Sequence, residues 1–115
     1  APEVVLHDLA RGSIDHAVAD AFRYGTLIVA ASSYDADVFP PMHFFLHKLN
    51  LKGYRNRRVG IIENASWAAT AARAMKAQMD KWKGIELLEP IVTVKSALHS
   101  TDVPALEALA DAALA

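Results

Sequence analysis

Hydrophobic and polar positions follow two alternating periods along the chain, and these periods predict strands and helices in turn. Short, mostly apolar runs at Thr26–Ala31, Val59–Ile62 and Ile91–Val94 are typical of strands covered on both faces. A further apolar run at Glu3–His7 predicts a strand at the start of the chain. Between the runs, apolar residues recur at helical spacing. The pattern predicts a doubly wound α/β domain with a parallel sheet and right-handed crossovers.

Capping residues and proline place the ends of the predicted helices. The helices are expected at about residues 14–24, 40–50 and 66–83, and from 101–102 onward. Ser13 is expected to cap the first helix, and the Pro40–Pro41 pair suits the first turn of the second. Gly25 and Gly84 are expected to follow the first and third helices, where a glycine tolerates the left-handed conformation.

Two of the apolar runs lead into small polar segments that each carry an aromatic residue. The first segment begins Ser32-Ser33-Tyr34-Asp35, and the second contains Asn64-Ala65-Ser66-Trp67-Ala68. Ligands of open α/β sheets bind outside the carboxyl ends of the strands, so two adjacent segments of this kind predict the rim of a pocket. Hydroxyls, a carboxamide, backbone N–H groups and two aromatic rings suit a flat, hydrogen-bonding heterocycle, and we expect a flavin.

The composition of the chain excludes several classes of function. The 115 residues correspond to one domain, 1–115, and a formal net charge of −1 provides no broad attraction to nucleic acid or to an anionic membrane. The absence of cysteine excludes thiol catalysis, zinc knuckles and iron–sulfur clusters. Neither a membrane-spanning apolar run nor a secretory signal is recognisable. A cytoplasmic location is therefore expected.

Three stretches together resemble a known family. They are LIVAASSYDADVFPPMHFFLHKL, RRVGIIENASWAATAARAMKAQM and VTVKSAL, and with them the chain resembles the flavodoxin-like domain of A-type flavoproteins, the flavodiiron proteins. The resemblance implies a three-layer α/β/α fold that binds FMN. It also implies a neighbouring β-lactamase-like domain with two irons, reduction of dioxygen or nitric oxide, an electron-donor protein and a homodimer or higher assembly.

The resemblance also assigns the candidate site residues. Ser32 to Asp35 would lie along one side of the isoalloxazine ring, and Asn64 to Ala68 would line the other side. The iron ligands of the family belong to the neighbouring domain and have no counterpart in this chain. We therefore predict no metal site and no catalytic residue, and we expect this chain alone to be inactive.

One departure from the family pattern affects the cofactor. Flavodoxin-type domains begin with a strand and a Ser/Thr- and Gly-rich loop that holds the FMN phosphate at a helix N-terminus. Here Ala1 already abuts what resembles the second strand. The first strand and first helix are expected to be absent, as in a domain truncated at its N-terminus. A flavodoxin-like interaction or structural domain without cofactor is the alternative function. A phosphorylated receiver domain of the same fold class is less favoured, because no Asp ends the strand at Ala31.

Several side chains near the predicted pocket admit two interpretations. Asp35 and Asp37 are expected to cap the following turn rather than to bind a metal, and an anion at Asp35 would lower the potential of a flavin. Trp67 either stacks on the ring or anchors the loop beneath it. Ser66 either contacts the flavin or caps the following helix.

Two other groups are expected to be solvated. His43 and His47 are spaced for one helix face, but no third metal ligand is nearby in the sequence. The only basic cluster is formed by Lys52, Arg55, Arg57 and Arg58. It is predicted to be a solvated loop, with docking of an acidic electron donor as the second interpretation.

Overall fold

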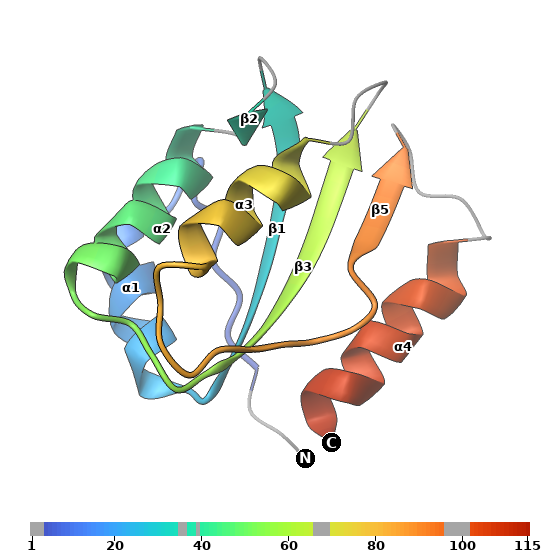
Figure 1. Cartoon of the computed structure of the whole chain (residues 1–115). Helices are drawn as coiled ribbons and strands as arrows, with labels where there is room; N and C mark the ends of the chain where they lie inside the picture. Colours follow the sequence, from blue (N-terminus) through green and yellow to red (C-terminus); the bar gives the residue numbers. More distant parts are fainter. Residues whose placement is uncertain (1–3, 35–36, 39, 66–69, 96–101) are drawn as a thin grey trace.

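The computed structural model describes residues 4–34, 37–38, 40–65, 70–95 and 102–115, and the side chains of Ser33, Tyr34, Asp37, Val38 and Ala65 fall outside this description. The elements follow one another as α1 (Ile14–Arg23), β1 (Thr26–Tyr34), β2 (Asp37–Val38), α2 (Pro40–Leu51), β3 (Arg58–Ala65), α3 (Ala71–Met79), β4 (Glu86–Leu87), β5 (Val92–Lys95) and α4 (Val103–Leu114). Figure 1 shows the strands side by side with helices around them. The alternation of strands and helices that the apolar pattern predicts is present.

β3 is the central strand of the sheet. It pairs in parallel with β1, from Thr26 opposite Arg58 to Ser32 opposite Asn64. On its other edge it pairs in parallel with β4 and then with β5, and the register shifts by two residues between them. β2 adds a short antiparallel pair to the end of β1. The long ladders are parallel, as predicted, and β2 is an antiparallel addition that the sequence pattern did not indicate.

Alternate residues of β3 point to opposite faces of the sheet, and each face packs against its own helices. Val59 and Ile61 are buried in one core with residues of α1, α2 and α3, which lie next to one another (Figure 1). Ile62 instead packs in the second core with Leu109 of α4. Gly60 lies on the same face, where an added Cβ would come within 3.0 Å of Leu109. The domain therefore has three layers, with helices on both faces of the sheet.

The outer edge of β1 is covered over only part of its length. Among the described strands, only β2 pairs with that edge, at Ser33 and Tyr34. The α4 layer contacts β3 and β5, and Ile28 on that face of β1 is 42% exposed. A strand with an apolar run at Leu27–Ala31 thus lies at the rim of the sheet.

The segment Val4–His7, predicted as a buried strand, is not a strand. Val4 is 81% exposed and Leu6 is 94% exposed, and neither pairs with any described strand. Strand residues need to pair their backbone groups with a neighbouring edge, and this segment makes no such pair with the described strands. An ion pair of 2.7 Å between His7 Nε2 and Asp20 ties the segment to α1 instead.

Local signals explain both ends of α1 and α2. Ser13 caps α1, and its hydroxyl accepts the His16 N–H at 3.2 Å, as predicted. Gly25 follows α1 but does not adopt a positive φ, because the chain leaves the helix through an extended Tyr24. The predicted ends of α2 agree with the structure to within one residue.

The third helix is shorter than predicted. α3 begins at Ala71, with Thr70 rather than Ser66 at the N-cap position, and it ends at Met79 rather than Lys83. Gly84 has its positive φ of 67° in the following loop. The Asn56 N–H donates to the Lys83 carbonyl at 2.9 Å, and Trp82 packs edge-on against Tyr54 at 5.0 Å between ring centroids. These contacts draw the chain out of the helix before the glycine. Among the described residues, none of the helices has both the length and the apolar character that a membrane span requires.

Candidate functional site

The ends of β1 and β3 form a hollow at the carboxyl edge of the sheet. This carboxyl-edge hollow has a volume of about 330 Å³ and is lined by Ala30, Ala31, Ser32, Ile62, Glu63, Asn64 and Val94. Its walls are therefore mainly apolar, with the hydroxyl of Ser32 and the carboxamide of Asn64 among them. A small-molecule site has this composition, and its volume is typically about 300–1,000 Å³.

Ser32 and Asn64 are the two predicted site residues that the structure brings together in full. They are register partners in the parallel ladder of β1 and β3, Ser32 is exposed and Asn64 is half-buried. Ser33, Tyr34 and Ala65 lie at the same strand ends, and only their backbone is described. Asp35, Ser66, Trp67 and Ala68 lie outside the described residues. The two predicted polar segments thus start side by side.

The polar segments begin within the strands and not beyond them. β1 continues to Tyr34 and β3 continues to Ala65, although the apolar runs stop at Ala31 and Ile62. The ladder explains this, because Ser32 still pairs with Asn64, and Glu63 still pairs with Thr93 of β5. Polar residues at a sheet edge satisfy the same backbone bonds as apolar ones. The candidate ligand contacts are therefore on rigid strand ends.

Glu63 lies beside the hollow on β3, but its side chain points to the α3 face of the sheet, as do Val59 and Ile61. Its side chain is 2% exposed, and Oε2 accepts the backbone N–H of Ala72 at 2.7 Å, at the start of α3. A sequence signal existed: a carboxylate directly follows an apolar strand and precedes a helix whose first turn contains no acidic residue. An acceptor from outside the helix satisfies one of its N-terminal N–H groups.

The histidine pair on α2 behaves as expected for solvated side chains. His43 and His47 are both exposed, and their rings stack with centroids 6.5 Å apart. No group of three or more potential metal-ligating residues occurs among the described residues. The described part of the chain offers this pair no third ligand.

Two arginines of the basic cluster have structural partners. The Arg57 guanidinium donates to the carbonyls of Phe22 and Tyr24 at 3.0 Å each and lies 5.2 Å from the Tyr54 ring centroid. Arg58 pairs with Glu86 at 3.1 Å and donates to carbonyls at the end of α4. Arg58 begins β3, about 20 Å from Asn64 along the strand. A donor docked on this cluster would be far from the carboxyl-edge hollow.

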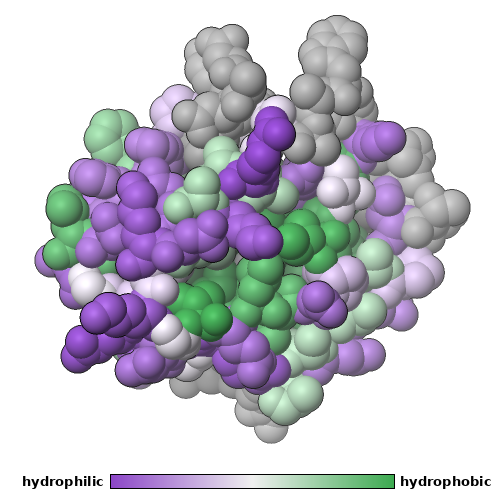
Figure 2. Space-filling view, viewed as in Figure 1, coloured by the Kyte–Doolittle hydropathy of each residue, from purple (hydrophilic) through white to green (hydrophobic). Residues whose placement is uncertain are grey.

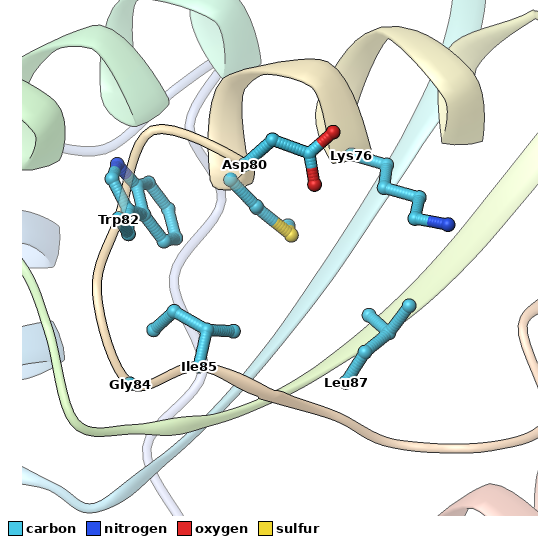
Figure 3. A pocket seen from close by; sticks show the side chains of 7 residues that line it. Lys76, Asp80, Trp82, Gly84, Ile85 and Leu87 are labelled. Atoms are coloured by element: carbon cyan, nitrogen blue, oxygen red, sulfur yellow. The ribbon is translucent and has the colours of Figure 1, made fainter.

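A second hollow lies near the C-terminal end of α3. It has a volume of about 300 Å³ and is lined by Lys76, Met79, Asp80, Trp82, Gly84, Ile85 and Leu87 (Figure 3). Figure 2 shows apolar surface in the middle of this face, below α3. None of the predicted site residues lines this hollow, so the carboxyl-edge hollow remains the candidate.

Comparison of the whole structure with solved structures identifies the fold. A flavodoxin from the domain Archaea superposes with a TM-score of 0.74 at 14% identity, covering 92% of this chain and 72% of that flavodoxin. The chain has a flavodoxin-like fold. Rubredoxin:oxygen oxidoreductase from the anaerobe Desulfovibrio gigas superposes with a TM-score of 0.72 at 14% identity, covering 87% of this chain. The chain spans 31% of that oxidoreductase.

The fold evidence comes from structure alone. A scan against family models found no match, and a search of curated proteins found no significant match. In a flavodoxin-like fold with β1 and β3 adjacent, the carboxyl-edge hollow lies where ligands of open α/β sheets bind. Fold and hollow therefore indicate the same place for a ligand.

Proposed function

We propose that this chain is an electron-transfer domain that holds FMN at the carboxyl edge of its sheet. The observation that carries the proposal is the register pair Ser32 and Asn64, which brings two polar strand ends to one hollow in a flavodoxin-like fold. The fold neighbours, a flavodoxin and an oxidoreductase, support the redox class.

The donor set of the hollow fits the ring of FMN. Ala30, Ile62 and Val94 provide apolar surface for the flat part of the ring. The hydroxyl of Ser32 and the carboxamide of Asn64 both donate and accept hydrogen bonds, as the polar edge of an isoalloxazine requires. When bound, FMN supplies the capacity to accept and release electrons. The protein's part is to bind and orient the ring and to exclude water from its apolar side.

The N-termini of α1, α2 and α3 are poorly suited to hold a phosphate. At α3 the Ala72 N–H is held by the Glu63 carboxylate, which would repel a phosphate, and at α1 the His16 N–H is held by Ser13. α2 begins with two prolines, of which neither has an N–H. The proposal therefore places the ring, not the phosphate, at the centre of recognition by the described residues.

A fluorescence titration tests the proposal. Flavin fluorescence is quenched when the ring stacks in a protein, so the chain is titrated with FMN and with riboflavin. We expect saturable binding of both. Their dissociation constants should agree within about threefold, or about 0.7 kcal/mol, because the proposal assigns recognition to the ring and not to the phosphate. If neither flavin binds, the chain is a flavodoxin-like interaction or structural domain without cofactor. If FMN binds far more tightly than riboflavin, the chain does contain a phosphate-binding site.

We further propose that the domain serves a flavodiiron-type oxidoreductase. Its partners would be a β-lactamase-like diiron domain and an electron-donor protein, the assembly would be a homodimer or larger, and the acceptor would be dioxygen or nitric oxide. The support is the superposition on rubredoxin:oxygen oxidoreductase. The test adds the FMN-loaded chain to an isolated diiron domain with a reductant and measures oxygen or nitric oxide consumption. A rate equal to that without the chain contradicts this role.

A further inference from the structure

The outward side of α2 is apolar although it faces solvent. Phe44 is 60% exposed and Leu51 is 71% exposed, and His43 and His47 between and beside them are exposed as well. We call these four side chains the α2 outer face. The buried residues of α2 gather on the other side of the helix: Met42, Phe45, Leu46 and Leu49. A surface helix ordinarily turns charged residues outward, so the large exposed apolar side chains of α2 call for a second explanation.

The spacing of Phe44 and Leu51 makes the α2 outer face complementary to itself. The two residues are seven apart, so they lie on one line along the helix, about 10 Å from each other. A seven-residue spacing is the repeat with which two helices pack along each other. A second α2, running antiparallel about a two-fold axis between His47 and Lys48, brings Phe44 of each copy opposite Leu51 of the other. The same apolar contact then forms twice.

The charges in and around the α2 outer face also favour a second copy over a charged partner. The face itself contains no acidic residue, lysine or arginine. At its flank Lys48 pairs with Asp15 of α1, with 2.6 Å between Nζ and the carboxylate. A flank that carries both signs can meet the same flank of another copy, with the carboxylate of one near the ammonium of the other. A strongly acidic or basic surface would find no matching charge on the face.

We propose that the α2 outer face docks a second copy of this chain, as an antiparallel pair of α2 helices in which Phe44 of each copy packs on Leu51 of the other. Figure 1 shows α2 at the side of the molecule, next to α1 and α3. One helix face is small beside a standard protein interface, so we expect a weak dimer with a dissociation constant on the order of 0.1 mM. The inference does not depend on flavin binding.

Sedimentation equilibrium of the whole chain without flavin tests the dimer. As the protein concentration rises to about 1 mM, the average mass should rise from that of one chain toward that of two. Phe44→Glu and Leu51→Lys should each weaken the association at least about tenfold, because each variant buries a charge against an apolar side chain of its own second copy. A wild-type chain that stays monomeric over this range overturns the proposal.

An equimolar mixture of Phe44→Glu and Leu51→Lys tests the antiparallel register. In a mixed dimer the new carboxylate at position 44 lies opposite the new ammonium at position 51, and the unchanged Leu51 and Phe44 lie opposite each other. We expect the mixture to associate within about threefold of the wild-type dissociation constant, although neither variant associates alone. Restored association also shows that both variants are folded. If the mixture stays monomeric while the wild type forms dimers, the register is wrong.

Two further substitutions distinguish this contact from other exposed apolar positions. Leu114→Glu places a charge at the end of α4, where the side chain is 62% exposed, and should change the dissociation constant by less than about twofold. Ile28→Lys places a charge on β1, beside the edge to which another strand can add, and should also leave the dimer intact. If Ile28→Lys abolishes the dimer and Phe44→Glu does not, the second copy docks on β1 and the proposal is wrong.

Discussion

Ser32 of β1 and Asn64 of β3 stand opposite each other as the last pair of the parallel ladder between the two strands. Side chains of paired residues in neighbouring strands lie on the same face of a sheet. A hydroxyl and a carboxamide from segments 32 residues apart in the chain therefore present one polar edge to the carboxyl-edge hollow.

Removing either polar group should weaken flavin binding. We expect Ser32→Ala and Asn64→Ala each to raise the dissociation constant for FMN by about three- to tenfold, the equivalent of one neutral hydrogen bond. The fluorescence titration measures it. Thr93→Ala, at an exposed position of β5, is the control and should leave the constant unchanged. An equal effect of all three substitutions would show that the loss is general and not due to the pair.

Tyr54 should be replaceable by Phe at little cost. Its hydroxyl is buried and has no hydrogen-bond partner in the described part of the chain, whereas its ring packs edge-on against Phe22 and Trp82. Tyr54→Phe keeps these ring contacts and removes an unsatisfied polar group. We expect the free energy of unfolding to stay the same or to rise by up to about 1 kcal/mol, measured by urea denaturation. A decrease of more than that would mean the hydroxyl is bonded.

The same residue predicts a pH dependence of stability at high pH. Burial raises the pKa of Tyr54 from 10.0 to about 12, and the nearby Arg57 guanidinium opposes the rise. The folded state thus holds this proton more tightly than the unfolded state. Its contribution to stability is complete below pH 10 and is lost as the pH rises toward about 12. Between these pH values, the midpoint temperature of thermal unfolding should fall less steeply with rising pH in Tyr54→Phe than in the wild type.

Two glycines with positive φ provide a matched pair of substitutions. Gly53 has a φ of 73° and open space where an added methyl group would lie, whereas at Gly84, with a φ of 67°, that group would collide with the Asn56 side chain. We expect Gly53→Ala to cost about 1 kcal/mol from backbone strain alone. Gly84→Ala should cost at least about 1 kcal/mol more, measured by urea denaturation. Equal costs would show that Asn56 moves aside freely.

α4 should depend on a single anchoring side chain. Leu109 is 1% exposed and is the only residue of α4 that is fully buried. Leu109→Ala should reduce the free energy of unfolding by about 2–5 kcal/mol. Leu114→Ala, at a position that is 62% exposed, is the control and should change it by less than about 0.5 kcal/mol. Amide exchange in α4 then tells whether the helix detaches before the rest unfolds.

Local sequence signals predicted the central elements because their causes are local. The apolar runs at 26–31, 59–62 and 91–94 correspond to β1, β3 and β5, and Ser13 and Pro40 mark helix starts. The adjacency of Ser32 and Asn64 followed from one topological rule for parallel sheets. The doubly wound α/β class could therefore be predicted from local signals, and the resemblance of three stretches to a known family added that the fold is flavodoxin-like.

Features that depend on distant partners could not be predicted in this way. Val4–Leu6 has the composition of a strand but pairs with no described strand, and α3 ends early because Trp82 packs on Tyr54. Glu63 looks like an ordinary polar residue after a strand until α3 brings the Ala72 N–H to it. The ring contacts predicted for residues 32–35 and 64–68 all stay predictions.

The apolar rim at β1 has a consequence for handling the protein. Its backbone groups from Thr26 to Ser32 form a template on which an extended segment of any chain can add a strand, and Ile28 supplies hydrophobic surface beside it. Concentrated solutions should therefore scatter light through reversible edge-to-edge association of molecules. We expect Ile28→Lys to reduce this association, because a charged side chain at the edge opposes strand addition. The substitution lies far from the carboxamide of Asn64.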